Sequence, residues 1–395
     1  MKSKQTATLL LNSMQKYLRS TSCPPSLGRQ SVTTNPSPDE SQPNMAKKRE
    51  VVVITGASAG VGRATVREFA RRGCDVGLIA RGKDRLEAAK REVEELGGRA
   101  VAIPCDVADA EAVEAAAEQI ERDLGPIDVW VNNAMVSVFS PVKQMQADEY
   151  RRVTEVTYLG VVHGTLAALK RMLPRNQGSI VQVGSALAYR SIPLQSAYCA
   201  AKHAIVGFTD SLRCELIHDQ SDIHLTVAHL PAVNTPQFEW SKSRMPRHPQ
   251  PVPPIFEPEV IARGIYFAAH ARRRELWIGF PTVKAILGQR VAAGYADRYL
   301  AKNGYDSQMT SEPVSPNRPD NLWDPAPGDF AAHGTFDEQA RKMSWQLKLN
   351  TNRGLLAAAL AGLGVGVFAL LRRDEIEEAA EKVSRELKSL TRRAA

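Results

Sequence analysis

Cysteine is scarce in this chain of 395 residues: there are five, far apart, and no two stand in C-x-x-C spacing. This excludes a disulfide framework and a zinc site made of cysteines, and it favours a reducing compartment. Lysine and arginine leave a net charge of +8 but form no stripe with interleaved aromatic residues, so nucleic-acid binding is not expected. His163, His203 and His229 lack metal-ligand spacing, and no metal site is expected.

The overall composition is that of an ordinary globular protein, with 43% apolar and 24% charged residues. Wholesale disorder, collagen-like repeats and a many-span membrane protein are thereby excluded. Five segments differ in character: 1–45, 46–300, 301–353, 354–371 and 372–395. The first lacks the long apolar run of a secretory signal and is interpreted as a disordered or targeting extension, or as sequence upstream of the true start.

The C-terminal segments are predicted to lie outside the main domain. Residues 301–353 are punctuated by prolines and predict an extended arm or linker. Residues 354–371 are uncharged and mostly apolar, and as a helix they would be about 27 Å long, close to the roughly 30 Å thickness of a bilayer core. They predict a transmembrane helix and a membrane-associated protein with its catalytic domain in the cytoplasm. A buried helix or an oligomer contact in a cytoplasmic protein is the alternative. Residues 372–395 predict a charged, solvated helix.

Short Val/Ile-rich runs alternate with helical patterns between residues 50 and 280. The runs are Val51–Thr55, Val76–Ala80, Ala100–Pro104, Ile127–Val131, Ser179–Gly184, His224–Leu230 and Glu275–Phe280. They mostly lack polar alternation, which is typical of strands buried on both faces. The alternation predicts an α/β fold with a doubly wound parallel sheet of Rossmann type. One more helix is expected over Val283–Leu300.

The first strand runs into a glycine-rich loop, and a helical pattern over Arg63–Arg72 follows directly. The loop reads Thr55-Gly56-Ala57-Ser58-Ala59-Gly60-Val61-Gly62. Glycines permit positive φ and a close approach of the backbone to a pyrophosphate, and the helix that follows offers free N–H groups to that anion. A loop in this strand–helix context predicts a dinucleotide site.

The second strand ends at Ala80 and Arg81, where NAD-binding folds carry an acid for the ribose 2′-OH. A guanidinium there can pair with a 2′-phosphate, which predicts NADP(H); a solvent-facing arginine is the alternative. Asp106 and Val107, just past the third strand, are placed to meet the adenine. An Asp at a strand end also often caps the next helix.

Three residues form a predicted proton-transfer set. Tyr198 and Lys202 stand four apart in the helical stretch Ser196–His218 and share one helix face, and Ser185 follows a strand. The reference pKa of tyrosine, about 10, is too high for a base at neutral pH, but a nearby ammonium lowers it. Tyr198 is therefore predicted to exchange a proton with an oxygen that Ser185 holds.

Residues 50–280 resemble the short-chain dehydrogenase/reductase family. The resemblance rests on the glycine loop, on Asn132-Asn133-Ala134 after the fourth strand, on Ser185, Tyr198 and Lys202, and on the stretch Pro231–Thr235. It implies one Rossmann-type domain that binds NAD(P)(H). The implied cofactor-binding residues are Thr55, Gly56, Ser58, Gly60, Val61, Gly62, Arg81, Asp106, Val107, Asn133, Ala134, Tyr198, Lys202, Pro231, Val233 and Thr235.

Three positions depart from the family pattern. Met135 and Ala232 stand where the family has glycines near the cofactor. Thr157 stands where the family has a fourth catalytic residue, an Asn that helps to hold a water in a proton relay; a hydroxyl has one donor where an amide has two. The departures leave a second interpretation open, a catalytically inactive NADP(H)-binding sensor or scaffold at a membrane.

The sequence thus predicts an NADP(H)-dependent enzyme that interconverts a carbonyl and an alcohol by hydride transfer. Residues 236–258 are Pro-rich and predict a mobile lid, in which Phe238 and Trp240 either line an apolar pocket or pack on the surface. With the apolar segment 354–371, they predict a lipophilic aldehyde or ketone as substrate. By analogy with the family, a homodimer or homotetramer is expected.

Overall fold

The structure is a computed structural model that describes residues 49–315, residues 318–352 and a few positions between 354 and 372. The predicted extension over 1–45 and nearly all of the predicted helical tail over 372–395 lie outside the described residues. Much of the segment 354–371 does as well, so its membrane insertion stays a prediction. Among the residues that are described, no helix is both long and apolar enough to cross a membrane.

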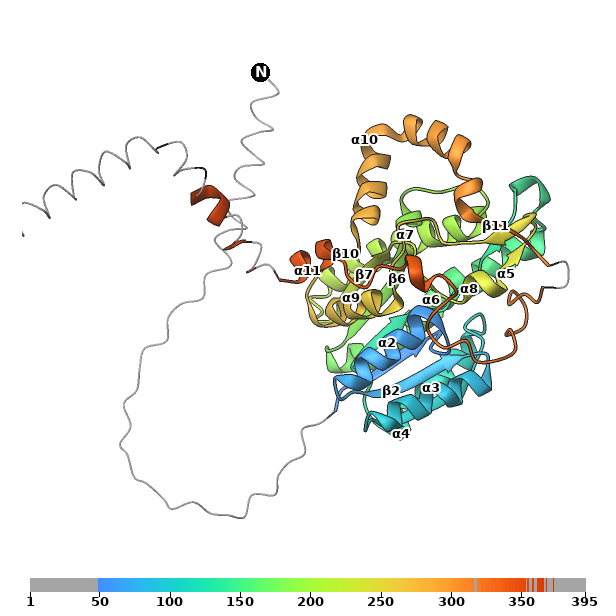
Figure 1. The fold of residues 1–395 in the computed structure, drawn as a ribbon. Helices are drawn as coiled ribbons and strands as arrows, with labels where there is room; N and C mark the ends of the chain where they lie inside the picture. Colours follow the sequence, from blue (N-terminus) through green and yellow to red (C-terminus); the bar gives the residue numbers. More distant parts are fainter. Residues whose placement is uncertain are drawn as a thin grey trace, which may run out of the picture. The chain divides into compact units, whose positions relative to one another are not determined.

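A seven-stranded parallel sheet forms the centre of the domain, in the order β10-β7-β6-β4-β1-β2-β3 (Figure 1). Its strands are β1 (Val51–Thr55), β2 (Asp75–Ala80), β3 (Ala100–Pro104), β4 (Val129–Asn132), β6 (Ser179–Ser185), β7 (His224–Leu230) and β10 (Glu275–Trp277). The central strands are buried on both faces, as their continuous Val/Ile runs require. The predicted doubly wound parallel sheet is confirmed.

Helices cover both faces of this sheet. One face carries α2 (Gly60–Arg71), α3 (Lys83–Glu95) and α9 (Pro258–His270), whose apolar side chains form one core cluster with the strands. The other carries α4 (Ala110–Leu124), α5 (Ala147–Thr154), α6 (Gly160–Met172) and α7 (Ser196–His218), which form the second cluster. Neighbouring residues of β1 alternate between the two clusters, because successive side chains of a strand point to opposite faces.

The last predicted strand is shorter than its apolar run. Gly279 has a φ of +81°, which turns the backbone away from the sheet after Trp277. Pro281 then occupies the first turn of α10 (Phe280–Asn303), a favoured place for proline because the N–H that it lacks would have no partner there. This helix is longer than the predicted one and is interrupted at Ala292, where φ is −141°.

Residues beyond α10 return to the domain. β11 (Met309–Pro313) pairs antiparallel with β9 (Arg247–Pro249), and α11 (Trp345–Thr351) buries Leu347 in the core. Between β11 and α11 lies an irregular stretch, which we call the C-terminal arm (residues 318–341). Its prolines cannot donate to a β-ladder, yet Leu322 and Ala332 are fully buried against the domain. The arm is thus packed on the protein surface (Figure 1).

Candidate active site

The glycine-rich loop joins β1 to α2 at the carboxyl edge of the sheet. Gly56 and Gly60 have φ values of +66° and +57°, which side chains other than glycine rarely adopt. A Cβ on Gly62 would lie 2.0 Å from the Gly56 carbonyl oxygen. The helix starts at Gly60, whose own N–H donates to the Ala331 carbonyl oxygen at 3.0 Å. The positive end of the helix dipole and the N–H groups that follow in the first turn favour an anion at this end.

Thr55 supports this loop from below. Its hydroxyl accepts hydrogen bonds from the backbone N–H groups of Asn133 and Ala134, at 3.0 and 3.1 Å. The Asn133 amide donates to the Thr55 carbonyl oxygen at 3.0 Å. These bonds tie the end of β1 to the segment after β4, so two predicted cofactor-binding elements are held together before any ligand arrives.

A cavity of about 410 Å³ opens at this edge, where parallel sheets hold their ligands. Fifteen of the predicted site residues line it: Gly56, Ser58, Gly60, Val61, Arg81, Asp106, Val107, Asn133, Ala134, Ser185, Tyr198, Lys202, Pro231, Val233 and Thr235. Thr55, Gly62 and Thr157 are not part of its wall; the first two shape the loop from behind.

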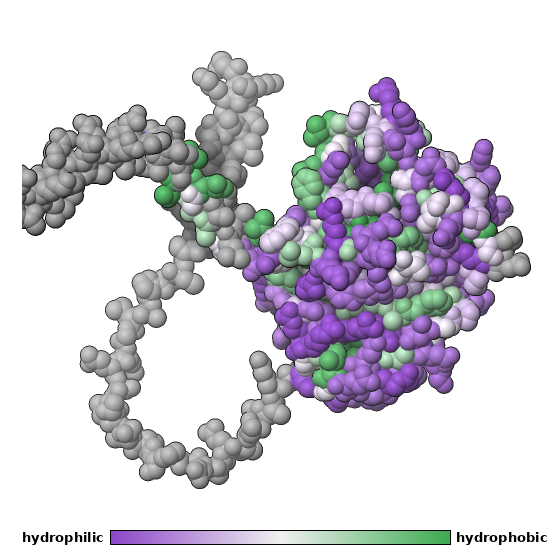
Figure 2. Space-filling view, in the orientation of Figure 1, coloured by the Kyte–Doolittle hydropathy of each residue, from purple (hydrophilic) through white to green (hydrophobic). Residues whose placement is uncertain are grey.

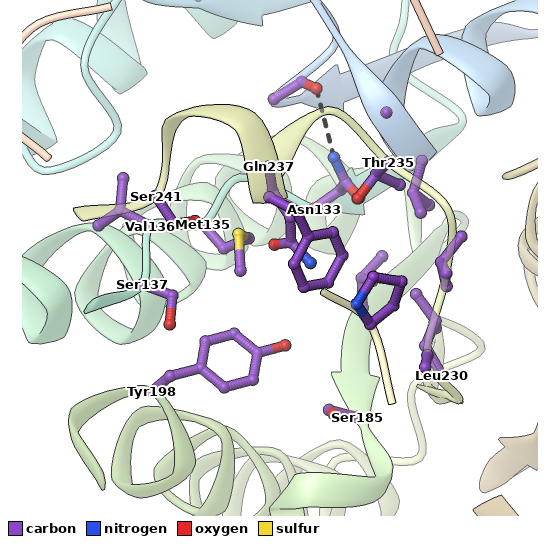
Figure 3. A pocket seen from close by; sticks show the side chains of 18 of the residues that line it. Asn133, Met135, Val136, Ser137, Ser185, Tyr198, Leu230, Thr235, Gln237 and Ser241 are labelled. Atoms are coloured by element: carbon purple, nitrogen blue, oxygen red, sulfur yellow. Dashed lines mark hydrogen bonds between the residues drawn. The ribbon is translucent and has the colours of Figure 1, made fainter. Parts of the chain in front are cut away.

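The proton-transfer set lies at one end of the cavity. Figure 3 shows the hydroxyls of Tyr198 and Ser185 directed into the same space, with Met135 beside it. Burial raises the pKa of Tyr198, and its hydrogen bond with Ser185 partly offsets that rise. At neutral pH Tyr198 is therefore a protonated phenol that can donate to a carbonyl oxygen.

Lys202 lies one helical turn after Tyr198 on α7 and is 2% exposed. Its Nζ is 5.5 Å from the centroid of the Tyr198 ring and donates to the Val183 carbonyl oxygen at 2.6 Å. Burial lowers the pKa of Lys202 to about 7, because a desolvated ammonium is unfavourable. An ammonium has three N–H donors, so two remain to bind a ribose hydroxyl or a water beside Tyr198.

The opposite end of the cavity carries two guanidinium groups. Arg81 follows β2 and donates to the backbone carbonyls of Asn321 and Trp323, at 2.5 and 2.6 Å. Arg85, one turn into α3, donates to the Ala326 carbonyl. Within the described part of the chain both guanidinium groups donate hydrogen bonds only to neutral carbonyls and neither forms an ion pair, so no carboxylate neutralises their charge by contact. This arrangement fits an anionic group, such as the phosphate of a dinucleotide.

Comparison with known proteins identifies the family. Residues 50–245 match the family model for short chain dehydrogenases. The chain is 33% identical over 320 residues to YxnA of Bacillus subtilis, described as an uncharacterized oxidoreductase; the match covers 80% of this chain and 89% of that one. The chain belongs to the short-chain dehydrogenase/reductase family. Its members use NAD(P), and this protein is an oxidoreductase of that family.

Two further relatives bear on the site. A fatty acyl-CoA reductase of Acinetobacter baylyi is 32% identical over 197 residues, which are 49% of this chain and 66% of that protein. The crystal structure of an alcohol dehydrogenase from Thermococcus sibiricus, complexed with 5-hydroxy-NADP, superposes with a TM-score of 0.50 at 29% identity. That likeness covers 58% of this chain and 95% of the other.

Thr157 fixes the backbone of Val136 by hydrogen bonds in this short-chain dehydrogenase/reductase. It lies in the π-helical turn Glu155–Leu159 between α5 and α6 and is fully buried. Its hydroxyl donates to the Val136 carbonyl oxygen at 3.0 Å and accepts from the Val136 N–H at 3.1 Å. Both hydrogen-bonding roles of the hydroxyl are therefore used to fix the cavity segment next to Met135.

Asp106 also has protein partners in this oxidoreductase. It accepts from the Ala108 N–H at 3.0 Å and from the Arg152 guanidinium, while Asp109 caps α4 by accepting from Ala112 N–H at 3.0 Å. The N-cap of α4, which was the alternative role considered for Asp106, is thus occupied by Asp109. Asp106 itself remains in the cavity wall at the end of β3.

Several wall residues have no counterpart in the sequence predictions. They are Arg85, Gln237, Pro281, Thr282, Ala285, Leu300 and Gln308, with Asn321, Pro325 and Ala326 of the C-terminal arm. Arg85 carried a weak signal, since it is one helical turn after Arg81. The others come from α8 (Gln237–Trp240), α10, the short 3-10 helix Asp306–Gln308 and the arm, and no local pattern shows that these elements return to the sheet edge. Phe238 and Trp240 line the cavity, which was one of the two alternatives predicted for them; the other was packing on the surface.

Proposed function

We propose that this oxidoreductase uses NADP(H) to interconvert a lipophilic aldehyde or ketone and the corresponding alcohol. One observation carries the proposal. A single cavity holds the glycine loop and two guanidinium groups at one end, and Tyr198, Ser185 and Lys202 at the other. A dinucleotide that lies along the sheet edge spans these two ends.

The chain's own residues then act on the substrate oxygen. Ser185 hydrogen-bonds the oxygen and fixes its position, and Tyr198 donates its phenolic proton to it. Lys202 supplies positive charge beside Tyr198, which favours the phenolate that remains. A nicotinamide cofactor, when bound, would supply or receive the hydride at the carbonyl carbon. In the direction of oxidation, Tyr198 takes the proton back.

The wall near Tyr198 favours a lipophilic substrate. Apart from Lys202, the charged side chains in the cavity wall are Arg81, Arg85 and Asp106, all beside the ends of β2 and β3. Apolar side chains such as Phe238 and Leu300 also line this cavity. A charged substrate would lose its hydration there without gaining a partner. The Acinetobacter relative is named a fatty acyl-CoA reductase, and a fatty acyl group is lipophilic, which agrees with this choice.

Cofactor choice is tested by binding measurements on the full chain, using NADPH and NADH fluorescence with Arg81→Asp. We expect the ratio of NADPH to NADH affinity to fall about tenfold or more, as loss of a charged hydrogen bond predicts. Because Arg81 also anchors the arm, the ratio is the decisive quantity: a loosened arm would weaken both cofactors alike. An unchanged ratio would contradict NADP(H) preference.

Turnover is tested with straight-chain aldehydes of increasing length and a short polar aldehyde as control. Each added CH₂ is expected to raise kcat/KM roughly fourfold until the pocket is full, from about 0.8 kcal/mol of burial. Tyr198→Phe should lower kcat by about 10²–10⁴ and leave cofactor affinity nearly intact. Binding of cofactor without turnover of any member of the panel would favour the sensor interpretation.

We also infer an association with anionic membranes. On α10, Val291 is 87% exposed and Tyr295 71%, and Figure 2 shows apolar surface over this helix. The helix carries four basic residues against one acidic residue, which complements an anionic bilayer, and 354–371 adds a long apolar segment. Flotation with phosphatidylserine vesicles should retain the full chain, and Val291→Asp with Tyr295→Asp should weaken retention. If the same amount of protein remained in the unbound fraction with and without vesicles, the inferred membrane association would be contradicted.

A further inference from the structure

The C-terminal arm is fastened to the lid. Arg318 donates through its guanidinium to the carbonyls of Phe238 and Glu239 in α8. The Asn321 N–H donates to the Trp240 carbonyl oxygen at 2.9 Å. Phe330 packs edge-on against the Trp240 ring, with the ring centroids 4.9 Å apart. The arm and the predicted lid therefore form one layer.

The same arm reaches the end of the cavity that faces β2 and β3. Arg81 and Arg85 bind its backbone carbonyls, as described above, and Arg152 donates to the Leu322 carbonyl at 3.0 Å. Leu322 is fully buried and belongs to the same core cluster as Val107. Asn321, Pro325 and Ala326 form part of the cavity wall. The arm thus forms the outer wall of the cavity at this end, and we call this part of the cavity the dinucleotide groove.

A third set of contacts ties the arm to the glycine loop. The Gly60 N–H donates to the Ala331 carbonyl oxygen at 3.0 Å. Ala332 is fully buried in a small cluster with Ala64 of α2 and Ala262 of α9. The three attachments follow the cavity from the lid, past β2, to the phosphate loop.

We propose that the C-terminal arm is a strap that closes the dinucleotide groove, so that the cofactor enters and leaves only when the arm detaches. This rests on the proposed function. A dinucleotide between the glycine loop and Arg81 would have the sheet edge beneath it and the arm outside it. The buried residues of the arm are Leu322, Ala326, Ala332 and Phe336, whereas most of residues 323–330 are exposed. Such a segment can open without unfolding the sheet.

Two substitutions loosen the strap without touching the cavity wall. Ala332→Leu places a larger side chain in a closed three-alanine contact, and Arg318→Gln removes the charged bonds to α8. The matched control is Ala115→Leu, at an exposed position of α4. We expect NADPH to dissociate about tenfold faster from both strap variants in stopped-flow fluorescence, since such changes act mainly on the dissociation rate. The control should dissociate like the wild type.

Hydrogen exchange provides a readout that a merely structural role would not change. NADPH should slow exchange over residues 318–337 in the wild type, and less so in the two strap variants. The strap proposal would be overturned if NADPH dissociated at the wild-type rate from both strap variants, or if NADPH did not change hydrogen exchange in the arm. Neither result would affect the proposal that the protein binds the cofactor. Failure of the wild type to bind either NADPH or NADH would overturn the proposed function, and the strap with it.

Discussion

At the scale of single residues, the buried Thr157 hydroxyl makes hydrogen bonds with both backbone groups of Val136, which are themselves buried. Thr157→Val keeps the shape and removes both bonds, leaving a buried N–H and a buried carbonyl without partners. We expect a loss of about 1–3 kcal/mol in the free energy of unfolding, measured by urea denaturation. Thr157→Asn carries both a donor and an acceptor in its amide and should retain turnover. Equal stability of Thr157→Val and wild type would contradict this role.

Lys202 is a residue whose burial opposes folding. Its folded pKa of about 7 lies below the 10.5 of an unperturbed lysine, so the unfolded chain binds the proton more tightly. The resulting penalty is absent at pH values above 10.5, grows as the pH falls and is complete below about 7. Lys202→Met should therefore raise the melting temperature at pH 7 while it abolishes turnover. A variant that is less stable than wild type at pH 7 would contradict the lowered pKa. Lys170→Met, at an exposed site, is the control.

The sequence predicted site residues whose chemistry follows from spacing. Tyr198 and Lys202 share a helix face, and Ser185 is the last residue of a buried strand, so the sheet edge brings them together. Arg85 was not predicted because a basic residue on an amphipathic helix looks like any solvated one. Its orientation toward the cavity depends on Trp240, whose ring lies 5.0 Å from its guanidinium and which comes from a distant segment.

At the scale of elements, the arm contains a pH-sensitive contact. His333 lies between Glu259 of α9 and Asp337, with ring-to-carboxylate distances of 2.9 and 2.6 Å. These two carboxylates outweigh desolvation and raise the pKa of His333 above 6.5. The contact therefore stabilises the arm fully below about pH 6.5 and loses this contribution as the pH rises through the raised pKa.

We expect hydrogen-exchange protection of residues 331–337 to be greater at pH 6 than at pH 8, after correction for the intrinsic exchange rates. His333→Gln should remove this dependence on pH, because a neutral amide does not titrate. Protection that is equal at both pH values in the wild type would contradict the role of His333.

Strands and most helices were predictable, whereas the packing of the arm was not. The runs over Val51–Thr55 and His224–Leu230 are continuous and apolar, so local composition determines their state. In the arm, isolated apolar residues such as Leu322 and Ala332 stand among prolines and polar residues. Their burial depends on partners on α2, α9 and around β3, and nothing in the local sequence shows that contact. The predicted strand over Glu275–Phe280 was too long because Gly279 ends it.

At the scale of the whole molecule, the segment after α10 is part of the folded unit. A chain that ends at residue 303 loses Met309, Leu322, Phe336 and Leu347 from the interior, each worth about 1.5–3 kcal/mol of burial. It also exposes Trp240 and Arg85. We expect a melting temperature lower by several degrees or more, measured by calorimetry, than that of a chain ending at residue 352. Equal melting temperatures would contradict this.

The contact between Arg81 and Leu322 joins residues 241 positions apart. At about 5–20 residues per second, a ribosome needs roughly 12–50 s to make the intervening chain. During that interval the strands up to β7 can already assemble, while the groove has no outer wall. A nascent chain can therefore bind its cofactor during synthesis, before the arm is in place. Exchange of the cofactor becomes slow only after the arm has been made and has packed on the domain.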